Sequence, residues 1–145
     1  MKRFIGIILL IVLSASCGSG DGRETISQEA MDEKREDIVE ILYFFGRQSC
    51  ISCGDIEVYS KDLIRDSFAV EVEEKKVGLR IIDLSKKENK AIGKKYEVVG
   101  SGLIISHWKD GVEEYEDMTA FSFNHLTTGE KEFKEEISKK IRELL

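Results

Sequence analysis

The 145-residue sequence contains no proline, two histidines and three cysteines. Acidic residues also outnumber basic ones, with 28 Asp and Glu against 22 Lys and Arg. Nucleic-acid binding depends on clustered positive charge that neutralises phosphates, so this balance argues against a nucleic-acid partner. Phosphate-binding loops, hydrolytic triads, nucleotide fingerprints and internal repeats are absent as well. We expect the partner to be a protein or a small molecule.

The N-terminus has the layout of an export signal. A basic pair, Lys2 and Arg3, precedes an apolar run over residues 4–13 and small residues up to Cys17. The apolar run is far shorter than the ~20 residues that a membrane-spanning helix needs, and no second apolar segment of that length follows. We therefore expect residues 1–16 to be a signal peptide and the remainder to be a soluble domain outside the cytoplasm.

The residues before Cys17 resemble a bacterial lipobox, in which the cysteine becomes the first mature residue and carries a lipid. Ser14 stands where the lipobox usually has leucine, three places before the cysteine. The resemblance implies lipidation of Cys17 and a place in the cell envelope or periplasm, attached to a membrane. Residues 17–36 would then be the lipid-anchored N-terminus, a polar tether and a possible short helix. The alternative is an ordinary secretory signal that is cut near Ser16 or Cys17.

Residues 37–145 have the size of one domain. The apolar run at 37–45, rich in β-branched and aromatic residues, predicts a strand that is buried on both faces. The order of elements predicts an α/β or α+β fold with a mixed sheet of about four strands flanked by helices. After the first strand we expect a helix over 52–76, a strand over 77–84, a polar helix over 86–97, a hairpin over 101–117, a loop over 119–129 and a C-terminal helix over 133–144.

Two cysteines three apart, Cys50 and Cys53, lie between the first strand and the first helix. With Cys17 assigned to the lipid, they are the remaining cysteines of the mature chain, and an oxidising compartment permits them to pair. A disulfide that closes so short a loop stabilises a fold little. A cysteine at a helix start is favoured as a thiolate by unpaired backbone N–H groups and by the helix dipole. This favours Cys50 as nucleophile and Cys53 as resolving thiol.

These features resemble the thioredoxin family over residues 37–145. The resemblance is carried by the buried strand that ends in aromatic residues, by C-x-x-C at a helix start, and by the later segment "KKYEVVGSGLIISHWKDGVEEYE". Small exported bacterial proteins of this kind also have Ile-Glu after the motif, here Ile56 and Glu57. The resemblance implies a thioredoxin-like fold and a thiol:disulfide oxidoreductase that acts on protein substrates and has a redox partner. The alternative is a thioredoxin-fold binding module, either a metal carrier or a redox-inactive scaffold.

The sequence departs from the family at three places. Phe44 stands where thioredoxin has a buried acid, and Gly102 stands where the family has a cis-proline that faces the cysteines. A non-proline cis bond costs ~2.5–4 kcal/mol, so we expect a trans peptide there. The two residues between the cysteines are unfamiliar, which leaves the reduction potential open across roughly −270 to −120 mV. The residues expected to support the pair or to face a substrate are Arg47, Ile51, Ser52, Ser101, Gly102 and His125.

The metal interpretation of the cysteines lacks ligands. A closed zinc site takes four, and outside the pair the candidates are His107 and His125. If Gly102 lies opposite the cysteines, His107 lies five strand residues further on, about 16 Å away. His125 is expected to emerge near the cysteines from the loop after the hairpin. No metal site and no cofactor are therefore predicted.

Overall fold

The computed structural model describes residues 37–47, 51–126 and 129–145, with the backbone alone for Ile51 and Ser52. The predicted signal peptide, Cys17, the tether and Cys50 lie outside the described residues. The elements are β1 (Ile38–Phe45), α1 (Ile51–Ser67), α2 (Ala69–Glu73), β2 (Val77–Asp83), η2 (Lys87–Asn89), α3 (Lys90–Lys95), β3 (Gly102–Lys109), β4 (Val112–Asp117), α4 (Thr119–His125) and α5 (Glu130–Leu144).

The strands form one mixed sheet in the order β2-β1-β3-β4. β1 pairs in parallel with β2 and antiparallel with β3, and β3 continues antiparallel into β4. This four-stranded mixed sheet, flanked by helices, confirms the predicted α/β fold. Residues 39–44 of β1 are all buried, and they alternate between a core on each face of the sheet. Burial on both faces therefore explains the run of apolar residues.

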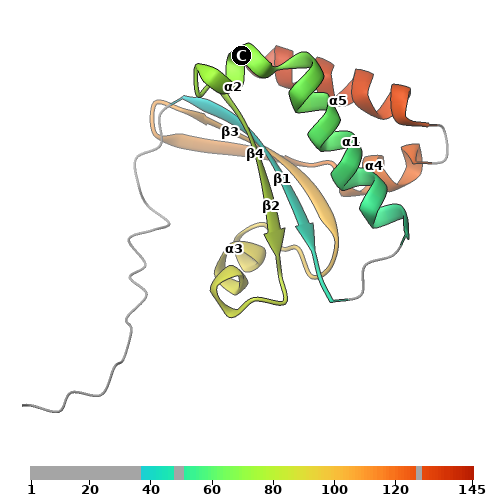
Figure 1. Ribbon diagram of the computed structural model, residues 1–145. Coiled ribbons are helices and arrows are strands. Elements are labelled where there is room, and N and C mark those ends of the chain that lie inside the picture. The colour runs from blue at the N-terminus through green and yellow to red at the C-terminus, as the bar shows by residue number, and fades with distance from the viewer. Residues whose placement is uncertain (1–36, 48–50, 127–128) are drawn as a thin grey trace, which may run out of the picture. The chain divides into compact units, whose positions relative to one another are not determined.

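Helices cover the two faces of the sheet unequally (Figure 1). Alternate β1 residues, among them Ile41 and Tyr43, face α1, α4 and α5 and share a core with Ile56 and Phe133. The residues between them, such as Phe44, face the short helix α3 on the other side. Strand periodicity therefore decides which β1 side chains can approach the helix that carries Cys53.

Two predicted boundaries are wrong. The helix expected over 52–76 ends at Ser67, because Phe68 leaves the helical conformation with φ −135° and turns its ring into the core. The loop expected over 119–129 contains the helix α4. Its Ser122 hydroxyl donates to the Met118 carbonyl at 2.8 Å. Its phenylalanines, Phe121 and Phe123, pack against the core that the sheet shares with α1 and α5. Packing rather than helix propensity accounts for so short a helix.

A polar cluster is buried on the α3 side of the sheet around Glu113, whose side chain is 8% exposed. The hydroxyl of Ser106 donates to Glu113 Oε1 at 2.5 Å, the Tyr96 hydroxyl donates to the same oxygen, and Lys95 pairs with Oε2. Burial acts to raise the pKa of Glu113, but the hydrogen bonds from these three residues outweigh it and leave the pKa below its ordinary value. The cluster thus connects Lys95 and Tyr96 at the end of α3 to Ser106 of β3 and Glu113 of β4. The loop that leads to Gly102 runs between the end of α3 and the start of β3.

Replacing Glu113 with glutamine is expected to lower the free energy of unfolding at neutral pH by about 1–3 kcal/mol, because Lys95 loses its charged partner in a buried site. The pKa of Glu113 is lowered in the folded state. Its stabilisation is therefore present above the unfolded pKa of 4.5 and is lost as the pH falls through the folded value.

Urea unfolding between about pH 3 and pH 7 measures this effect. The wild type should lose more stability in acid than Glu113→Gln, so that the two converge at low pH. The exposed neighbour Glu114 gives the matched control, Glu114→Gln. Parallel pH profiles for Glu113→Gln and the wild type would contradict this account of the cluster.

Candidate functional site

The candidate site lies between the end of the central strand β1 and the start of the first helix α1. β1 ends at Phe45, and α1 begins at Ile51, directly after Cys50 in the sequence. Cys53 lies in the first turn of α1, is 3% exposed and is disulfide-bonded. The second cysteine of the C-x-x-C motif therefore lies in the first turn of the helix that follows β1, while Cys50 itself lies outside the described residues.

Tyr43 of β1 binds the backbone of the buried cysteine. Its side chain is 1% exposed, and its hydroxyl donates to the Cys53 carbonyl at 2.5 Å. Burial and the nearby charge of Glu57 raise the pKa of Tyr43 to about 12, while a hydrogen bond with the Ser101 hydroxyl lowers it. The phenol thus lies between β1, the first turn of α1 and the loop before β3.

Ser101 and Gly102 are brought to this end of the sheet, as predicted. Gly102 starts β3 and pairs with Phe44, next in sequence to Tyr43. A Cβ atom at Gly102 would lie 3.0 Å from the Thr119 hydroxyl oxygen and 3.0 Å from Val98 Cγ1. Thr119 cannot retreat freely, since the same oxygen accepts a hydrogen bond from the Leu103 amide at 3.1 Å. The close approach favours glycine at this position, because any Cβ atom would force Thr119 or Val98 to shift.

Replacing Gly102 with alanine is expected to destabilise the fold by about 1–3 kcal/mol, because the added methyl group overpacks this contact. Gly100 provides the control, since a Cβ atom there would meet no described atom within 4 Å. Thermal or urea unfolding of Gly102→Ala and Gly100→Ala measures the difference. Equal stability of the two variants would refute the preference for glycine at position 102.

Arg47, Ile51 and Ser52 are three more of the predicted supporting residues. Arg47 is exposed. Hydrogen bonds from Ser85 lower the pKa of Asp83, and the charges of Lys86 and Arg47 add smaller contributions. The side chains of Ile51 and Ser52 are outside the described part. Glu57 is half-buried and pairs with Lys61 at 2.6 Å, a turn further along α1.

The two histidines lie in different elements, His107 in β3 and His125 at the end of α4. His107 pairs with Val39, at the far end of the strand from Gly102, so its predicted position is confirmed. His125 ends α4, a helix that starts beside Leu103 and contacts α1. Its Nδ1 donates to the Phe121 carbonyl at 2.9 Å, and its ring stacks on Phe121 at 4.0 Å between ring centres. A role for His125 at the cysteines stays a prediction.

Tyr43 and Thr119 are the residues that sequence reasoning missed. The alternation of β1 contained a signal for Tyr43, because residues 39, 41 and 43 share one face of a strand. A strand that is apolar on both faces does not reveal which face the helix covers, so Phe44 drew attention instead. Thr119 carried no local signal, because its role depends on the register between β3 and the start of α4.

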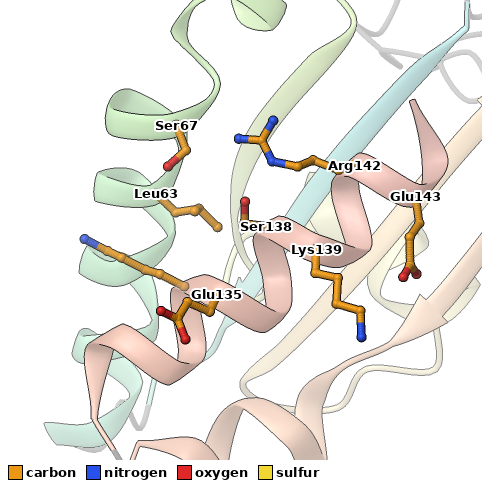
Figure 2. A pocket seen from close by; sticks show the side chains of 8 residues that line it. Leu63, Ser67, Glu135, Ser138, Lys139, Arg142 and Glu143 are labelled. Atoms are coloured by element: carbon orange, nitrogen blue, oxygen red, sulfur yellow. The ribbon is translucent and has the colours of Figure 1, made fainter.

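A pocket of ≈ 500 Å³ lies away from this site, between α1 and α5 (Figure 2). Arg142 reaches from α5 toward α1, on the side of Leu63 and Ser67. Leu63 follows Cys53 by ten helical residues, a separation of about 15 Å along the axis. Within the described ranges, no group of three or more His, Cys, Asp or Glu could hold a metal ion, and no helix is long and apolar enough to cross a membrane.

No protein-family model and no curated protein matches the sequence. Among solved structures, the chain is similar to thioredoxin-2 of the malaria parasite, described as a component of its protein secretion machinery. That likeness has 24% identity and a TM-score of 0.41, and it covers 63% of this chain and 80% of that one. A second similar structure is described as a malarial protein, with 21% identity, a TM-score of 0.39, and coverage of 57% and 82%. Both likenesses concern the fold, and neither assigns an activity to this chain.

Proposed function

We propose that this chain is an exported, lipid-anchored thiol:disulfide oxidoreductase that uses Cys50 and Cys53 on protein substrates. The observation that supports it most is the position of Cys53. This cysteine is buried, disulfide-bonded and in the first turn of a helix whose start follows Cys50 directly. A pair so close in sequence closes too short a loop to serve mainly as a staple, so redox chemistry accounts for it better.

The exchange begins with the thiolate of Cys50. This thiolate attacks one sulfur of a partner's disulfide, a bond forms between the two proteins, and the partner's other sulfur leaves as a thiolate. Cys53, as a thiolate, then attacks Cys50 and releases the partner's second sulfur. The partner gains two electrons and, with two protons, becomes a dithiol, while the Cys50–Cys53 pair becomes a disulfide. The reverse sequence oxidises a partner, and a redox partner restores the pair in either direction.

The helix start supports Cys50 as the attacking thiol. Unpaired backbone N–H groups and the positive end of the dipole favour a thiolate there. The first turn of α1 contains no acidic residue, since Asp55 and Glu57 lie beyond it. The turn that would stabilise the thiolate therefore contains no opposing charge of its own.

Export and anchoring are proposed from the N-terminal sequence. The basic pair, the short apolar run and the small residues before Cys17 are typical of a lipoprotein signal. A lipid on Cys17 would hold the domain at a membrane of the cell envelope, where disulfide chemistry is permitted. Residues 18–27 are small and polar, as expected of a tether between a lipid and a domain.

Turnover in the presence of a chelator tests the proposal. We expect the protein to catalyse insulin-type disulfide reduction or thiol oxidation after thorough chelation, and we expect the reduced monomer to bind zinc weakly, through its two thiolates. The result that would replace the oxidoreductase with a metal-binding module is tight, stoichiometric zinc or copper binding without turnover of any disulfide or dithiol. Absence of both activities would favour a redox-inactive scaffold.

A further inference from the structure

The Tyr43 side chain is buried in the core on one face of the central strand. Its strand lies between β2 and β3, where Tyr43 pairs with Ile81 and Leu103. Its ring stacks on Phe45 with 6.3 Å between ring centres. The side chain has few rotatable bonds, and burial among these neighbours leaves its hydroxyl little freedom. A hydrogen bond from such a group fixes its acceptor more firmly than one from a flexible surface side chain.

The acceptor is the backbone of the cysteine that has to close the disulfide. The Tyr43 hydroxyl donates to the Cys53 carbonyl at 2.5 Å, and the Ser101 hydroxyl, in the loop before β3, is close enough to the same phenol to lower its pKa. The nearby charged group is Glu57 of α1, and with burial it keeps the phenol neutral and able to donate. One hydroxyl thereby connects the central strand, the first turn of α1 and the loop that leads to Gly102.

We propose that Tyr43 is a positioning residue of the thiol–disulfide site, which holds Cys53 where it can form the disulfide and resolve a mixed disulfide. This inference rests on the function proposed for Cys50 and Cys53. Two thiols close a disulfide more readily the better they are held in the reactive geometry, because positioning raises their effective concentration. The bond from Tyr43 is present in the form in which Cys53 is disulfide-bonded. Loss of the phenol oxygen should therefore disfavour the disulfide form more than the dithiol form.

Tyr43→Phe removes that oxygen and keeps the ring. We expect the equilibrium with glutathione to shift about fivefold toward the dithiol, which is about 20 mV in potential at 29.6 mV per tenfold change. We also expect mixed disulfides to live longer in the variant, because Cys53 attacks Cys50 more slowly. The control is Tyr115→Phe, a half-exposed tyrosine of β4 whose ring meets Tyr96 on the other side of the sheet.

The potential separates positioning from a merely structural role. A hydrogen bond that stabilises both redox forms equally lowers the stability of both when it is lost, and by linkage it leaves the potential unchanged. A shift of the potential requires that Tyr43 distinguish the two forms. Ser101→Ala gives a second test that disturbs the core less, and it should shift the equilibrium about twofold in the same direction.

The outcomes are distinct. A shift toward the dithiol in Tyr43→Phe, with Tyr115→Phe unchanged, supports the inference. If the wild type exchanges normally while Tyr43→Phe has an unchanged potential, or shifts toward the disulfide, Tyr43 does not position the pair although the oxidoreductase assignment stands. If Tyr43→Phe does not fold, an unshifted Ser101→Ala overturns the inference. A wild type without any exchange with glutathione overturns the proposed function and this inference together.

Discussion

Replacing Cys53 with serine is expected to turn the protein into a trap that stays linked to its partners through Cys50. Cys53 is buried in the first turn of α1, so a partner's sulfur should meet the other cysteine first. Without the second thiol, the mixed disulfide has no internal route to resolution. We expect mixed disulfides to accumulate while turnover falls by roughly two orders of magnitude or more.

Incubation with disulfide-bearing extracts, followed by non-reducing separation and mass spectrometry, measures the trapped species. Cys50→Ser is the matched variant, since it removes the other thiol and keeps the same change of sulfur to oxygen. Cys50→Ser should neither trap partners nor turn over substrate. If Cys50→Ser traps partners and Cys53→Ser does not, the roles of nucleophile and resolving thiol are reversed.

Replacing Cys17 with alanine is expected to abolish membrane attachment. Each buried methylene of a lipid chain contributes about 0.8 kcal/mol to membrane binding, so loss of the lipid should move nearly all of the protein. The variant should appear in the soluble exported fraction or remain as an uncut precursor. Within the described residues, no helix is long and apolar enough to cross a membrane.

Fractionation of cells and mass spectrometry of the mature N-terminus measure the effect. Cys53→Ser serves as the control, because it removes a cysteine outside the signal and should leave the protein at the membrane. An unmodified N-terminus on the wild-type protein would refute lipidation. An ordinary secretory signal cut near Ser16 or Cys17 would then explain the N-terminal sequence.

Hydrophobic periodicity predicted most of the fold. The strand over 37–45 and the hairpin over 101–117 are present within a residue or so of their expected bounds, because burial imposes clear patterns on both. The C-terminal helix was predicted from an apolar stripe of Phe133, Ile137, Ile141 and Leu144, of which the first three are buried and Leu144 is partly buried. A repeated apolar pattern identifies a helix or strand even where the residues at its ends are not predicted correctly.

Tertiary contacts explain what the sequence did not reveal. The break at Phe68 depends on where the core can accept an aromatic ring, and α4 depends on packing that its own sequence does not favour. The hydrogen bond of Tyr43 requires knowledge of which sheet face α1 covers. In the candidate site, the sequence therefore identified the chemical groups, while the residues that hold them in place required the fold.

The reduction potential of Cys50 and Cys53 tests the central claim most directly. Equilibration of the chelated wild-type protein with glutathione or dithiothreitol buffers, followed by thiol trapping, measures the fraction oxidised. We predict a single two-electron transition between roughly −270 and −120 mV that is lost in Cys50→Ser. The contradicting result is a pair without a transition in that range, together with tight, stoichiometric zinc or copper binding that His125→Ala abolishes.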